Sequence, residues 1–205
     1  MIHQPIYDTT KVNQWLETYT RFLNALGWLH QIGSGFPARG TEIAALYYKN
    51  SPTQLRSIFL HGQYVAVIPE HNKTNNLRSS PFRTARFLDK FSSRVMIDNL
   101  VVLRTIADDL LAKTGKSKCG HVYINMGKPL DNFSEIVEEG FERFSEQQIS
   151  IAQWRHITVA LCNCDIFQNL LKSSTIEVRK YFENDFTEYD EDLVPDLQVS
   201  HLLIP

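Results

Sequence analysis

The segment over residues 37–46 places an arginine, Arg39, at the start of an expected helix, and Glu42 follows it one turn later. A second arginine, Arg155, lies in another expected helix much later in the chain. Arginine stays charged at any working pH and can hold two phosphate oxygens through parallel hydrogen bonds. Two such cations at one spot would suit a phosphodiester, because fixed donors stabilise the charge that grows on its oxygens. The simpler alternative is that Arg39 only caps its helix or pairs with Glu42, and that Arg155 is structural or stacks on Trp154.

Charge is unevenly distributed along the 205 residues, although the formal net charge is -2. Residues 1–70 hold five basic and four acidic side chains, 71–120 hold ten and four, and 121–205 hold six and fifteen, which gives +1, +6 and -9. The middle region is therefore the candidate for binding anions. The alternative is that its lysines and arginines only cover an exposed loop and helix.

The hydrophobic pattern predicts a single, mainly helical domain. Apolar spacing and helix-forming composition predict five helices, over 10–30, 39–48, 93–113, from 131 onward and from 150 onward. Two β-favouring runs, at 58–60 and 64–68, flank a glycine turn and predict one small β-hairpin. The polar segment 71–81 predicts an exposed loop, and the seven acids over 183–196 predict a solvated linker. The expected fold class is mainly α (α+β), with a domain over 1–182 and an acidic C-terminal segment over 183–205.

Several motifs resemble the catalytic domain of tyrosine recombinases, the phage-integrase superfamily. RGTEIAAL at 39–46 is similar to the helix of that family that begins with its first catalytic arginine, and it precedes the expected hairpin. WRHITVA at 154–160 is similar to the second-arginine helix, and DLQVSH at 196–201 lies where the family has a Gly-His segment. More closely, GFPARGTE, RSIF and HNKT resemble the recombinase-like regions of fungal telomere-linked RecQ-type helicases and of Crypton-like mobile elements. The resemblance covers about residues 25–201 and implies a recombinase-like, multi-helix domain with one small β-hairpin.

The resemblance also implies roles for individual residues in the cleavage and rejoining of DNA strands. Arg39 and Arg155 would clamp the scissile phosphate, and Glu42 would orient Arg39. Lys73 would protonate the departing 5′ oxygen, and His201 would donate a hydrogen bond to a non-bridging oxygen. Basic side chains of the loop around Lys73 would add DNA contacts: Arg78, Arg83 and Arg86.

Two positions depart from the family pattern. The residue three before Arg155, usually a histidine, is Ala152, so His156 is the candidate to replace its proton-transfer group. The nucleophilic tyrosine of the family follows the Gly-His segment, whereas this sequence ends four residues after His201. Without that nucleophile no phosphotyrosyl bond can form. We therefore expect a DNA-binding domain derived from a tyrosine recombinase that does not cleave DNA by itself.

The implied partner is double-stranded DNA in the nucleus, in recombination or integration, and further copies of the chain could assemble on it. No membrane partner is expected, because no apolar run approaches the roughly 18 to 20 residues that span a bilayer. No nucleotide or other cofactor is expected either. The motif Gly115-Lys116-Ser117 resembles the end of a phosphate-binding loop, but Leu110 stands where such a loop needs glycine.

The three cysteines fit free thiols in a reducing compartment better than a disulfide framework. Cys119, His121, Cys162 and Cys164 have the right chemistry for zinc, but their spacing is not that of a common structural site, so no metal is expected. The first ten residues also lack the basic-then-apolar order of a secretory signal. An intracellular location is therefore expected.

Two other functions stay open at this stage. The chain could belong to an active recombinase, or to a telomeric helicase-associated protein, that a tyrosine-bearing helix completes in trans. It could instead be a decayed domain that interacts with proteins through its acidic tail and has no affinity for nucleic acid. Duplex DNA binding with a steep salt dependence would separate the DNA-binding hypotheses from the last one.

Overall fold

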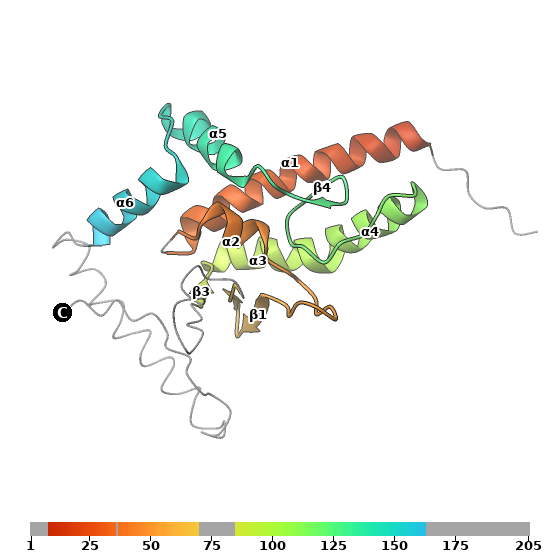
Figure 1. The fold of residues 1–205 in the computed structure, drawn as a ribbon, viewed down its shortest axis with the longest axis horizontal. Helices are drawn as coiled ribbons and strands as arrows, with labels where there is room; N and C mark the ends of the chain where they lie inside the picture. Colours follow the sequence, from red (N-terminus) through yellow and green to blue (C-terminus); the bar gives the residue numbers. More distant parts are fainter. Residues whose placement is uncertain (1–7, 36, 70–84, 163–205) are drawn as a thin grey trace, which may run out of the picture.

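The computed structural model describes residues 8–35, 37–69 and 85–162, and Figure 1 shows their arrangement. These residues are 57% helix and 12% strand, so the chain is mainly α with a small antiparallel β component, as the sequence predicts. The elements in chain order are α1 (Thr9–Gly33), α2 (Gly40–Ala44), β1 (Ile58–His61), β2 (Tyr64–Val67), β3 (Arg86–Phe87), α3 (Lys90–Asp98), the π-helical turn η2 (Asn99–Leu103), α4 (Arg104–Lys113), β4 (Ile124–Asn125), β5 (Lys128–Pro129), α5 (Phe133–Ser145) and α6 (Ile151–Cys162). The predicted loop over 71–81, the acidic segment over 183–205 and the expected domain end at 182 lie outside the described residues.

Helix α1 forms where the sequence predicts it. Asp8 caps its first turn, because its carboxylate accepts hydrogen bonds from the backbone N–H groups of Thr10 and Lys11. Its apolar stripe is buried in the core at Val12, Leu16, Tyr19, Leu23 and Leu26. Amphipathic spacing of this kind is sufficient to fix which face of a helix turns inward.

The predicted helix over 93–113 is longer than expected and contains a π-helical turn. It begins at Lys90, because the Asp89 carboxylate caps its first N–H groups. Segments α3, η2 and α4 follow one another without a break. The π-helical turn starts at buried Asn99, whose Oδ1 accepts a hydrogen bond from the Tyr19 hydroxyl at 3.0 Å. That bond ties the wide turn of the helix to α1.

The predicted hairpin is correct, but it is part of a larger sheet. Strands β1 and β2 pair antiparallel with His61 opposite Tyr64, and Gly62 in the turn has a φ of 56°. A third strand, β3, adds to β2 with Val67 opposite Arg86. Arg86 was predicted to lie in the same basic loop as Arg78 and Arg83, and this prediction is wrong: Arg86 begins β3, which satisfies backbone groups that β2 would otherwise leave unpaired.

The expectation of a single hairpin is also wrong, because β4 and β5 form a second one. Asn125 pairs with Lys128 across a two-residue turn at Met126 and Gly127, whose φ values are 49° and 91°. Positive φ at both central positions is the geometry of a tight hairpin turn.

Helix α2 is shorter than the predicted range of 39–48, since it ends at Ala44. The chain then leaves the helix to pair with a later segment. The Tyr48 N–H donates to the Gly120 carbonyl at 3.0 Å, and the Val122 N–H donates to the Leu46 carbonyl at 2.8 Å. These bonds between distant segments compete with helix propagation, which local composition alone favours.

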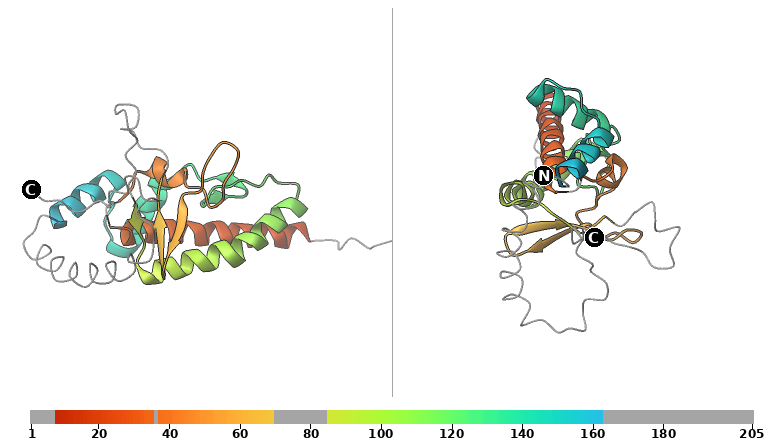
Figure 2. Two further views of the ribbon diagram at one scale, coloured as in Figure 1. Left: turned by 90° about the horizontal axis from the view of Figure 1, so that it is seen from below. Right: turned by 90° about the vertical axis from the view of Figure 1, so that its left-hand side faces the viewer.

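The helices and the sheet pack in layers around one core. Figure 2 shows α3 between α1 and the β1–β2–β3 sheet, with α5 packed on the opposite side of α1. The α1–α5 contact is close: a Cβ built at Gly140 would lie 2.0 Å from the Trp28 ring. Within the described ranges, no helix combines the length and apolar character needed to cross a bilayer.

One arginine of the basic middle region belongs to the core. Arg104 is only 1% exposed and its guanidinium donates to the backbone carbonyls of Cys119 and His121 and to the Asp108 carboxylate. The aromatic ring of Tyr48 also lies 4.5 Å from the guanidinium carbon. Arg104 therefore fixes the loop before β4 to helix α4 and is a structural residue.

Candidate functional site

The carboxylate of Glu42 holds two arginines from different parts of the chain. Glu42 Oε1 lies 3.5 Å from Arg39 Nη1, and Glu42 Oε2 lies 3.4 Å from Arg86 Nη2. Glu42 Oε2 also accepts a hydrogen bond from the Arg39 backbone N–H at 3.1 Å, which fixes the carboxylate at the start of α2. The side chains of Glu42 and Arg86 are 12% and 14% exposed, whereas that of Arg39 is 40% exposed.

The third arginine, Arg155 on α6, lies close enough to Arg86 to repel it. Burial lowers the pKa of the Arg86 guanidinium, the negative charge of Glu42 raises it, and the positive charges of Arg155 and Arg39 lower it again. Arg39, Arg86 and Arg155, here called the arginine cluster, therefore share one electrostatic environment. Arg39 directly precedes α2, Arg86 lies in β3 and Arg155 lies in α6.

Close packing of α2 against α5 and α6 explains how Arg155 reaches this position. A Cβ built at Gly40 would lie 3.0 Å from Ser134 Oγ and 3.3 Å from Ile151 Cδ1. A side chain at position 40 would need both neighbours to shift by a few tenths of an ångström, so the start of α2 packs closely on the first turns of the two later helices. The first turn of α6 is held by Ser150 and Gln153, whose side chains and N–H groups bond to each other as their capping-box spacing predicts.

Counting only the residues that the structure describes, positive charge exceeds negative charge at the arginine cluster. Arg155 is half-buried, and in the part of the chain that the structure describes its guanidinium forms no ion pair or hydrogen bond. It also makes no cation–π contact with Trp154, whose ring lies 5.1 Å from that of Phe141 instead. An arginine held near two others without a carboxylate of its own is a favourable place for an anion.

A buried, neutral histidine lies near Arg86. His30 on α1 is fully buried, and its Nδ1 lies 2.8 Å from the Tyr123 hydroxyl. Burial lowers the pKa of His30 to about 3, and the positive charge of Arg86 contributes in the same direction. Burial also raises the pKa of Tyr123. The sequence analysis missed His30, although position 30 continues the buried spacing of Leu23 and Leu26 on the same helix.

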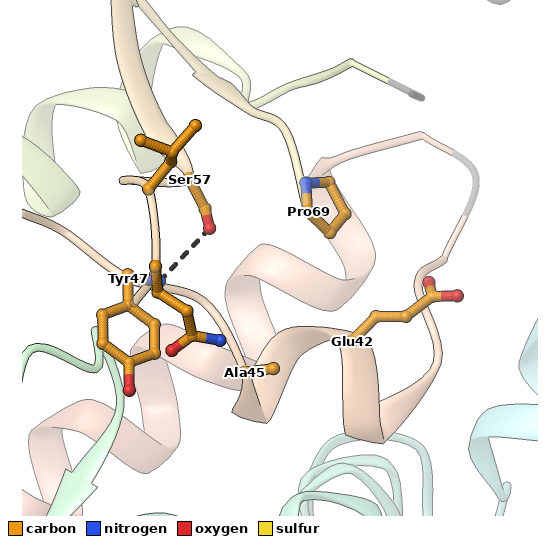
Figure 3. A pocket seen from close by; sticks show the side chains of 7 residues that line it. Glu42, Ala45, Tyr47, Ser57 and Pro69 are labelled. Atoms are coloured by element: carbon orange, nitrogen blue, oxygen red, sulfur yellow. Dashed lines mark hydrogen bonds between the residues drawn. The ribbon is translucent and has the colours of Figure 1, made fainter. Parts of the chain in front are cut away.

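A shallow hollow lies on the other side of Glu42. It is open to solvent and is lined by Glu42, Ala45, Tyr47, Gln54, Leu55, Ser57 and Pro69. Figure 3 shows its wall formed by α2 and by the segment where the Tyr47 N–H donates to Ser57 Oγ at 3.3 Å. Glu42, which pairs with Arg39 and Arg86, lines the hollow, but none of the three arginines of the cluster does.

The remaining predicted site residues are not placed with the cluster. His156 follows Arg155 on α6 but is exposed, and no contact with another described residue links it to the arginines. Four predicted residues lie outside the described part of the chain: Lys73, Arg78, Arg83 and His201. Among the residues that are described, no three His, Cys, Asp or Glu side chains are arranged to hold a metal ion.

The structure thus brings together Arg39, Glu42, Arg86 and Arg155 at the junction of α2, β3 and α6. Comparisons with models of protein families, with curated proteins and with solved structures find no match to this chain. The functional assignment therefore depends on the chemistry of this junction.

Proposed function

We propose that the chain binds double-stranded DNA and holds a backbone phosphate at the arginine cluster, as its resemblance to tyrosine recombinases implies. The observation that carries this proposal is that Arg39 and Arg155, which are 116 positions apart in the sequence, both lie close enough to Arg86 to act on its charge. Arg39 and Arg155 are also the two residues that the resemblance assigns to the phosphate clamp. Recombination or integration of nuclear DNA is the process in which such a domain would act.

The four residues divide into two groups by exposure. Arg39 is 40% exposed and Arg155 is half-buried without an ion pair among described residues, so both can reach a phosphate oxygen. Arg86 and Glu42 are mostly buried and paired with each other. They act as positioning residues that hold the Arg39 guanidinium in place. Planar guanidinium groups arranged in this way bind phosphate in two-point contacts that lysine cannot make.

Binding of a fluorescein-labelled duplex, followed by fluorescence anisotropy between 50 and 200 mM salt, tests this function. We expect the affinity to fall steeply with salt for the unmodified chain. The double variant Arg39→Ala/Arg155→Ala should bind at least about tenfold more weakly, and the slope of log affinity against log salt should shrink by about 2. Excess inorganic phosphate should compete only weakly, because it cannot make the additional contacts of a duplex.

A matched control removes two positive charges elsewhere. Arg21 and Arg94 are exposed on α1 and α3, and neither belongs to the arginine cluster. Arg21→Ala/Arg94→Ala should leave the affinity nearly unchanged. If both double variants lose affinity equally, the effect is one of net charge and the proposed clamp is wrong.

A further inference from the structure

A second stretch of the chain, outside the arginine cluster, contains lysines and no acidic residue. Between Asp109 and Asp131 there is no acidic residue, while four lysines occur in this interval: Lys113, Lys116, Lys118 and Lys128. Lys113 pairs with Asp109, and Lys116 donates to the Asn13 side chain at 2.8 Å. Lys118 and Lys128 are exposed, and within the described ranges neither forms an ion pair.

The fold adds a lysine from another segment to this pair. Tyr47 forms a β-bridge with His121, and the Tyr48 N–H donates to the Gly120 carbonyl, so Lys49 lies against the loop that carries Lys118. A Cβ built at Gly120 would lie 3.8 Å from Lys49 Cγ. Lys49 is exposed and, like Lys118, has no ion pair in the part that the structure describes.

The same loop also packs on the β4–β5 hairpin, which brings Lys128 into the group. A Cβ built at Gly127 would lie 2.5 Å from the Ser117 carbonyl oxygen, so the backbones of the loop and the hairpin turn touch. Lys118 follows Ser117, and Lys128 follows Gly127. Lys49, Lys118 and Lys128, here called the lysine ridge, therefore gather from three segments that backbone contacts hold together.

The backbone segments that carry the lysine ridge lie along the same edge of the fold as α2 and α6, which flank or carry Arg39 and Arg155. In the left view of Figure 2, α6, α2 and β4 follow one another along this edge, with α1 and α4 on the opposite side. Helix α2 connects the two sites, because Arg39 precedes it and Lys49 comes shortly after it. A linear polyanion that follows this edge would pass both sites.

We infer that the lysine ridge is a second contact for the backbone of the same DNA duplex, separate from the arginine cluster. The inference rests on the proposed function, since it takes duplex DNA as the ligand. Exposed lysines without carboxylate partners neutralise phosphates and release counterions when DNA binds. An anionic membrane fits less well, because none of the exposed large apolar side chains among the described residues lies between residues 110 and 130.

Acetylation of lysines with and without DNA tests the inference directly. The full chain is treated briefly with an acetylating reagent in the presence or absence of a 30-base-pair duplex, and each lysine is quantified by mass spectrometry. DNA should protect Lys49, Lys118 and Lys128 several-fold. Lys11 and Lys90, which are exposed on α1 and α3, should react equally in both samples. Equal modification of the ridge lysines with and without bound DNA would overturn the inference.

A charge variant separates this inference from the proposed function. Lys49→Gln/Lys118→Gln/Lys128→Gln should bind the duplex at least about tenfold more weakly and reduce the salt slope by about 2.7, with an unchanged midpoint of urea unfolding. The matched control is Lys11→Gln/Arg21→Gln/Lys90→Gln, which should have little effect.

If only the arginine variant loses binding, the ridge is wrong and the clamp stands. If only the lysine variant loses binding, the clamp is wrong and the ridge is the DNA site. If the chain binds vesicles of anionic lipid through the ridge but binds no duplex, both are wrong.

Discussion

The Glu42 carboxylate and the Arg86 guanidinium meet at 3.4 Å, although one lies in a short helix and the other in a strand 44 residues later. Because Glu42 also pairs with Arg39, the position of one exposed arginine depends on a strand that contributes only two residues to the sheet. Pairing of β3 with β2 therefore places Arg86 beside Glu42.

Glu42→Gln should weaken DNA binding by about tenfold, although it adds net positive charge. The amide can still accept the Arg39 N–H, but it cannot hold two guanidinium groups that repel each other. The same change should lower the free energy of unfolding by about 1 to 3 kcal/mol, because Arg86 stays mostly buried. Fluorescence anisotropy and urea unfolding measure the two effects. Tighter binding by the variant would contradict this role, because it would mean that the negative charge of Glu42 only repels the DNA.

His30 should make stability depend on pH between neutrality and acid. Its folded pKa is about 3, below the 6.5 of an unfolded histidine, so only the unfolded chain takes up this proton as the pH falls below 6.5. The contribution is fully present above pH 6.5, and about 2 kcal/mol of stability should be lost by pH 5. Urea unfolding at pH 7 and pH 5, followed by tryptophan fluorescence, measures this loss. In His30→Gln the difference between the two pH values should shrink by that amount, and an unchanged difference would contradict a buried neutral imidazole.

Arg104→Met should be strongly destabilising even though Arg104 belongs to the most basic region of the chain. The guanidinium is 1% exposed and satisfies backbone carbonyls before β4, so its removal leaves these carbonyls and Asp108 without their donor. We expect a loss of about 3 to 5 kcal/mol in the free energy of unfolding. The control Arg94→Met, at a side chain 76% exposed and paired with Asp98, should cost less than about 1 kcal/mol. Similar urea midpoints for the two variants would be inconsistent with the structural role of Arg104.

Local patterns in the sequence were sufficient to predict where the long helices lie and that Arg39 and Glu42 meet. The i, i+3 spacing of Arg39 and Glu42 predicts that their side chains meet, and they lie 3.5 Å apart. The π-helical turn at Asn99 and the extension of α3 to Lys90 change only details of a helix that its apolar stripe predicts.

Contacts between distant segments could not be predicted from the same patterns. Arg86 follows the polar segment 71–81 and was assigned to the same loop, whereas pairing with β2 makes it part of a strand. Helix formers at residues 44–46 favour a longer α2, but hydrogen bonds to residues 120–122 end it. For Arg104 a signal existed: it lies three and seven residues before buried Ala107 and Leu111, on the inward face of α4.

The most direct test of the central claim is a double-mutant cycle for duplex binding with Arg39→Ala, Arg155→Ala and the double variant, at one fixed salt concentration. If both arginines hold one phosphate, removing either disturbs the contact of the other. The cost of the double variant should then differ from the sum of the single costs by about 0.5 to 3 kcal/mol. Costs that add to within about 0.5 kcal/mol would show that the two side chains act at independent places and would contradict a shared phosphate clamp.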